Sequence, residues 1–155
     1  MKIPAKFKEA ALAELGFIIS KSKDTKDPER LLYYFSGAYG FINRILNFEF
    51  HSSLCLIHMV LQNTHQTFIG RLKAIQQGDR AYPLLDVQFE KLIQLTEAMA
   101  EKIQRNESLQ GIVEDFSALS YSAGGNGNFL MEKGMLKLSD DSAEAKVESE
   151  DTGKA

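Results

Sequence analysis

All three histidines of the chain lie in one stretch, and their spacing is the first feature that could do chemistry. His51, His58 and His65 follow one another at intervals of seven residues, so in a helix they project from one line along its surface. Imidazole is the commonest metal ligand in proteins and the side chain best suited to move protons near neutral pH. The stretch therefore holds the candidate residues for metal binding and for acid–base catalysis.

Metal binding would have to use adjacent helical turns, because residues seven apart are separated by about 10 Å along a helix axis. His51 and Cys55 are four residues apart, so they could share one ion if another helix supplied further ligands. The Glu-x-x-His pairs of di-iron carboxylate bundles are absent, since Glu49 precedes His51 by only two residues. The alternative places the histidines in half-buried positions with local hydrogen bonds, and we expect no bound cofactor.

A second pairing joins Arg44 to His51, with six residues between them. This spacing resembles the Arg-x(4–6)-His signature of the HEPN superfamily, although Asn43 precedes the arginine and the pair lies in mid-chain, whereas the family places it on a late helix. The resemblance implies a small α-helical bundle that acts as a metal-independent ribonuclease in a dimer. His51 would then move a proton at a ribose 2′-hydroxyl, and Arg44 would stabilise charge on the scissile phosphate.

Long runs of helix-forming residues must position these side chains. With three prolines in 155 residues and almost no alternating apolar pattern, the chain belongs to the all-α class. We expect a bundle of four long helices and a shorter fifth, over residues 4–21, 28–46, 50–77, 83–105 and 108–121. The third helix is apolar on nearly every side from Leu54 to Leu61, which is typical of a helix enclosed by others. We therefore expect it at the centre of the bundle.

The residues after the fifth helix have a different composition. SAGGNGN is too rich in glycine for a helix, and FLMEKGMLKL predicts a small hairpin or an irregular C-terminal arm on the bundle. From Ser139 to Ala155 the largest apolar residue is one valine, which predicts a disordered acidic tail. We expect one domain over residues 1–138 and this tail over 139–155.

Charge and hydropathy exclude several classes of function. The net charge is −3, but six of the 21 acidic residues and two of the 18 basic ones lie in the tail, so the body is close to neutral. A near-neutral body does not indicate nucleic acid as a partner. No run reaches the roughly 20 apolar residues of a membrane span, and charged residues interrupt the N-terminus, unlike a secretory signal. The sequence predicts a soluble cytoplasmic protein without a membrane partner.

Surplus apolar residues indicate a binding surface. Tyr33, Gly37 and Gly40 share one face of the second predicted helix. A glycine inside a helix costs about 1 kcal/mol relative to alanine, so another helix should approach closely there, within the monomer or across a dimer interface. A groove for a ligand is the other explanation of this strip. Phe129 and Met131 add apolar surface in the C-terminal arm.

These observations favour a non-enzymatic interaction or oligomerisation module, as a homodimer or with a protein partner, that uses the tyrosine, the glycines and the arm. The alternatives are a HEPN-like ribonuclease and a metal-binding bundle.

Overall fold

The computed structural model describes residues 2–78, 86–125 and 138, and within them the regular structure is entirely helical. The predicted all-α class is confirmed. In chain order the elements are a 3₁₀ turn at Ala5–Phe7, α1 (Lys8–Asp24), α2 (Pro28–Phe35), α3 (Gly37–Phe48), α4 (Ser52–Gln76), α5 (Asp86–Gln104) and α6 (Gln110–Ser122).

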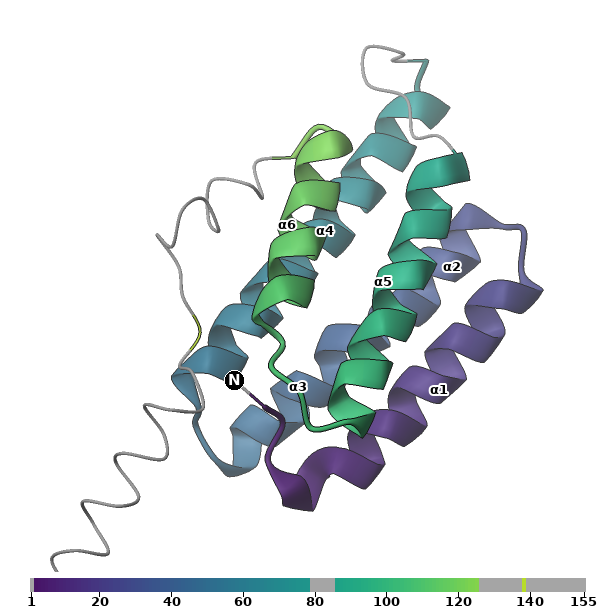
Figure 1. Ribbon diagram of the computed structural model, residues 1–155. Helices are drawn as coiled ribbons and strands as arrows, with labels where there is room; N and C mark the ends of the chain where they lie inside the picture. The colour runs from purple at the N-terminus through teal and green to yellow at the C-terminus, as the bar shows by residue number, and fades with distance from the viewer. Residues whose placement is uncertain (1, 79–85, 126–137, 139–155) are drawn as a thin grey trace, which may run out of the picture.

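The helices form two layers around one core. In Figure 1, α1, α5 and α6 lie in front, while α4 and the α2–α3 pair lie behind them. α5 packs on both α1 and α6, α4 packs on α6, α2 and α3, and α1 closes the circuit against α2 and α3. Large apolar side chains between the layers are fully buried, among them Phe35, Phe68 and Phe116. Burying each contributes about 1.5–3 kcal/mol to stability.

Local sequence signals set several helix ends. Asp27 caps α2 and Pro28 occupies its first turn, where the missing N–H of proline costs nothing. Gly78, with φ of +94°, follows α4 in the left-handed conformation that glycine tolerates best. The helix predicted over residues 28–46 is divided in the structure. A turn at Ser36 separates α2 from α3.

The expectation that the third predicted helix lies at the centre of the bundle is wrong. α4 packs on α2, α3 and α6, and among the described residues it keeps an exposed side that includes Met59. Between Leu54 and Leu61, four apolar side chains are fully buried, namely Leu54, Ile57, Val60 and Leu61, whereas Met59 is exposed. Periodicity shows that a helix face is apolar, but it does not show whether a neighbour packs against that face.

The C-terminal part of the chain is described at one residue only. Leu138 is buried, and its backbone N–H donates a hydrogen bond to Oε1 of Gln110, 2.9 Å away at the start of α6. The hairpin or arm, including Phe129 and Met131, and the acidic tail lie outside the described residues.

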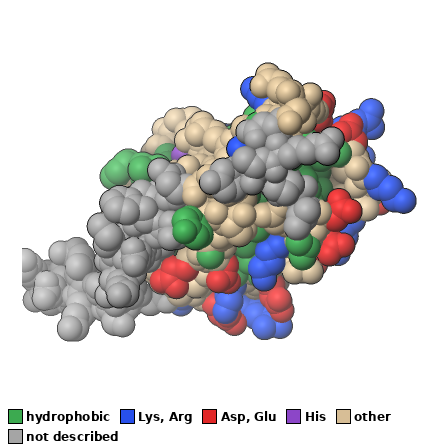
Figure 2. All heavy atoms as spheres, turned by 90° about the horizontal axis from the view of Figure 1, so that it is seen from above, with side chains coloured by type: hydrophobic (Ala, Val, Ile, Leu, Met, Phe, Trp, Pro, Cys, Tyr) green, Lys and Arg blue, Asp and Glu red, His purple; other side chains and the backbone are tan. Residues whose placement is uncertain are grey.

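Two surface properties bear on possible partners. Basic and acidic side chains are interspersed on the face that Figure 2 shows, in keeping with a body whose charges nearly balance. None of the described helices combines the length and the hydropathy that a membrane span requires.

Candidate functional site

A groove of about 430 Å³ lies between α2 and α4. Its walls are mainly apolar, with Leu32 and Tyr33 contributed by α2 and Ile69 and Leu72 by α4. Polar and charged side chains complete the lining, namely Glu29, Ser36, His65, Lys73 and Gln76. The groove thus combines apolar walls with a few placed polar groups, as binding sites in proteins commonly do.

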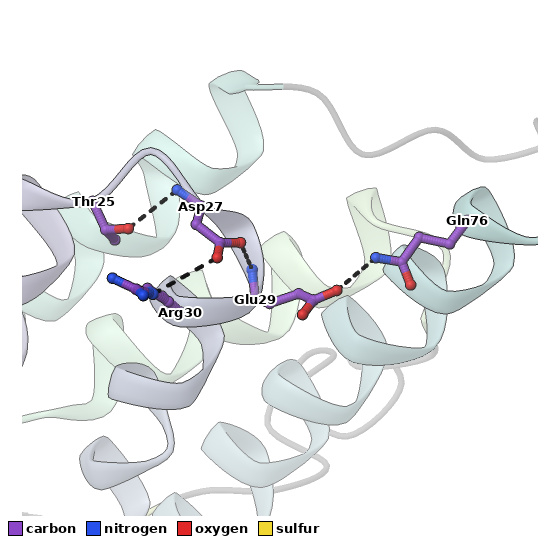
Figure 3. A network of polar contacts seen from close by, with 5 residues as sticks. All are labelled: Thr25, Asp27, Glu29, Arg30 and Gln76. Carbon is purple, nitrogen blue, oxygen red and sulfur yellow. Dashed lines mark hydrogen bonds and ion pairs between the residues drawn. The ribbon is translucent and has the colours of Figure 1, made fainter.

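A polar network holds one end of the groove together (Figure 3). The carboxylate of Asp27 accepts a hydrogen bond from the backbone N–H of Glu29 at 3.0 Å. The backbone N–H of Asp27 donates to Thr25 Oγ1 at 3.1 Å. Arg30 lies 3.9 Å from the same carboxylate. Across the groove, Gln76 Nε2 donates to Glu29 Oε1 at 2.7 Å. The first turn of α2 is therefore tied to the last turn of α4.

His65 forms the floor of the groove and is only 8% exposed. Its Nε2 lies 2.9 Å from the carbonyl oxygen of Leu32, and its Nδ1 lies 2.9 Å from the hydroxyl of Tyr39. A carbonyl oxygen can only accept, so Nε2 carries the proton, and in the neutral ring Nδ1 accepts from the Tyr39 hydroxyl. Both ring nitrogens are thereby satisfied inside the protein.

These two hydrogen bonds span the break between α2 and α3. Leu32 belongs to α2 and Tyr39 to α3, on either side of Ser36. The carbonyl of Leu32 also accepts from the N–H of Ser36 at 3.1 Å, and the Ser36 hydroxyl donates to the carbonyl of Tyr33 at 2.6 Å. His65 therefore fixes both helices against α4 at the point where the backbone pattern is interrupted.

Burial keeps this cluster in its neutral state. It lowers the pKa of His65, although the hydrogen bond to Leu32 opposes the shift. It also lowers the pKa of His58, whose ring meets Tyr39 edge to face at 5.4 Å, and it raises the pKa of the Tyr39 phenol. Because desolvation penalises charged forms, all three side chains are uncharged at neutral pH.

The candidate ribonuclease residues have separate partners. Arg44 forms an ion pair with Glu14 of α1. His51 lies just before α4, with Nε2 3.7 Å from Glu49, and Glu49 itself pairs with Lys6 at 2.5 Å. Within residues 2–78, 86–125 and 138, no hydrogen bond or ion pair joins Arg44 to His51. Each side chain is directed to a different acidic residue.

The candidate metal ligands lie on adjacent turns, as expected. The backbone N–H of Cys55 donates to the carbonyl of His51 at 3.0 Å, and Cys55 is half-buried. The part of the chain that the structure describes holds no group of three or more His, Cys, Asp or Glu residues arranged around a metal position.

The predicted interface strip divides between two surroundings. Tyr33 is 73% exposed at the rim of the groove. At Gly37 an added Cβ would lie 3.0 Å from Ile18 Cδ1, so this glycine serves the close packing of α3 on α1. Around Gly40 there is open space. The close approach expected at the glycines occurs within the monomer at Gly37.

The sequence predicts one wall of the groove and not the other. Tyr33 is recognisable as surplus apolar surface, whereas nothing in the sequence distinguishes the α4 wall of Ile69, Leu72 and Lys73. These residues are three and four positions apart, which places them on one face of a helix, but this spacing does not reveal which other helix lies opposite. No family model, curated protein or solved structure matches this chain.

Proposed function

We propose that the protein is a non-enzymatic interaction module and that the α2–α4 groove is its binding surface. The observation that carries this proposal is the position of Tyr33, an aromatic side chain 73% exposed beside an apolar groove. Tyrosine is enriched among the residues that dominate protein–protein binding energy, and apolar surface rimmed by charged groups marks interaction sites. Glu29 and Lys73 supply such charges here.

The state of His65 supports binding over catalysis in the groove. Its two ring nitrogens are engaged by Leu32 and Tyr39, and burial lowers its pKa. A general acid or base needs a nitrogen within reach of the reacting proton. In this arrangement the imidazole stabilises the groove floor and presents its ring to a bound side chain.

The ion pair of Arg44 favours the groove over the ribonuclease alternative. Glu14 occupies the guanidinium, so a phosphate would have to displace a carboxylate before Arg44 could stabilise it. His51 faces Glu49, a carboxylate that already pairs with Lys6, so no described contact directs His51 toward Arg44.

Site-specific photo-crosslinking tests the proposal. A benzophenone amino acid replaces Tyr33 in the groove or, as the control, Tyr121, which is 59% exposed on α6. The proteins are irradiated when pure and in an extract of the source cells, then separated on a denaturing gel. We expect covalent protein adducts from position 33 and not from position 121. Equal yields at both positions, or no adduct at position 33, would contradict the proposal.

A further inference from the structure

We propose that the occupant of the groove is a second copy of this chain, related to the first by a two-fold axis that runs along the groove. The inference rests on the proposed function and specifies the partner. It follows from the direction of the two walls, the position of their charges and the place of the exposed tyrosine.

The two walls of the groove run in opposite directions. Glu29, near the start of α2, is hydrogen-bonded to Gln76, the last residue of α4. Leu32, farther along α2, is bonded to His65, which lies earlier in α4. α2 and α4 are therefore neighbours that run in opposite directions.

A two-fold axis along the groove sets each wall of one copy opposite the other wall of the second copy. Positions along the groove do not change. Rotation by half a turn brings α2 of one copy opposite α4 of the other, at the same level. Such an interface is isologous, so the surface must be complementary to itself. The charges and apolar groups of the groove must then match across the walls.

The charges satisfy this condition. Glu29 on α2 and Lys73 on α4 are both exposed and line the groove. Lys73 is one helical turn before Gln76, the residue that bonds to Glu29, so the two charges stand within about one turn of each other along the groove, a distance that two long side chains can span. In the two-fold arrangement Glu29 faces the partner's Lys73, and the same pair forms a second time. Opposite charges placed across an interface fix its register and suppress other partners.

The apolar groups satisfy it as well. Tyr33 is one turn beyond Glu29 on α2, while Ile69 and Leu72 precede Lys73 on α4. Exchange of the walls therefore places each exposed tyrosine ring against the apolar α4 wall of the other copy. The association removes two large aromatic side chains from water.

Charge exchange between two variants tests the arrangement. Glu29→Lys alone would set two lysines against each other twice, and Lys73→Glu would do the same with two glutamates. We expect each variant to dimerise about tenfold more weakly than the natural chain by sedimentation equilibrium. An equimolar mixture restores both opposite-charge pairs, so the mixed dimer should regain the natural affinity.

Two controls separate this test from other effects. Lys91→Glu makes the same change of charge on α5 in the other layer. Its mixed dimer with Glu29→Lys still sets one pair of lysines against each other, so mixing these two should not restore the natural affinity. Thermal melting of each variant shows whether the bundle is intact, since Glu29→Lys also removes the bond to Gln76.

The outcomes separate the partner from the function. A dimer whose two charge variants fail to recover on mixing would overturn the two-fold arrangement. A natural chain that is monomeric at all concentrations, yet crosslinks from position 33 to another protein, would overturn the second copy while the interaction module stands. The absence of any adduct at position 33 would remove both.

Discussion

The two ends of the histidine line on α4 show how different the surroundings of one residue type can be. His65 is buried, with both ring nitrogens bonded to groups from α2 and α3. His51, two heptads earlier, stands just before the helix, and its Nε2 has no hydrogen-bond partner among the described residues. The carboxylate of Glu49 lies 3.7 Å from this nitrogen.

The groups that neighbouring helices bring to an imidazole determine whether its nitrogens are hydrogen-bonded. At the His65 end, the carbonyl of Leu32 and the hydroxyl of Tyr39 converge from two helices. At the His51 end, the chain turns between α3 and α4 and offers one carboxylate, which Lys6 already engages. We infer that His65 is a structural residue of the groove and that His51 contributes little to the fold.

Removal of each imidazole should show the largest difference between the two positions. His65→Ala should lower the free energy of unfolding by about 2–4 kcal/mol, because it leaves a cavity and a half-buried tyrosine hydroxyl without its acceptor. His51→Ala, the matched control, should change it by no more than about 0.5 kcal/mol. Urea unfolding monitored by circular dichroism measures both. Equal losses at the two positions would show that the ends of α4 do not differ as described.

The pH dependence of stability should show a smaller effect from the same difference. Burial lowers the folded-state pKa of His65 and His58 below the ordinary value of 6.5. Between those values the unfolded chain binds more protons than the folded one, so stability falls as the pH decreases. Their contribution is complete above about pH 6.5 and is lost as the pH falls through the folded-state pKa values.

The glutamine variant of His65 provides the control for that measurement. His65→Gln keeps an amide donor and acceptor but cannot titrate, so its stability should change less between pH 7 and pH 5 than that of the natural chain. The remaining change includes the contributions of His58 and of carboxyl groups such as Glu49 and Glu107, whose pKa values their lysine partners lower. Identical pH profiles for the two proteins would show that His65 does not titrate with the expected sign.

The sequence predicts where the helices begin and end far better than it predicts which helices pack against each other. Asp27 with Pro28 and the glycine at position 78 marked helix ends because capping depends on residues close in sequence. Hydrogen bonds of His65 join residues 26 and 33 positions apart, and no local pattern specifies them. The interruption at Ser36 was not predicted, because serine occurs both inside helices and at their ends, and the hydroxyl bond to Tyr33 is not specified by the residue type alone.

The candidate site was predicted on one side only. Tyr33 was identifiable as a surplus aromatic residue, whereas its opposite wall required the antiparallel packing of α2 on α4 to be known. Arg44 and His51 were paired by spacing along the chain. Their spacing along the chain gives no indication of the ion pair that Arg44 forms with Glu14 of α1.

The most direct test of the central claim, that the groove holds a second chain, is sedimentation equilibrium of three proteins over a range of concentrations. The natural chain and Tyr121→Ala should dimerise with the same dissociation constant. Tyr33→Ala should dimerise at least roughly tenfold more weakly, because it removes the ring that fills the opposing apolar wall. A Tyr33→Ala dimer as tight as that of the natural chain would contradict the account.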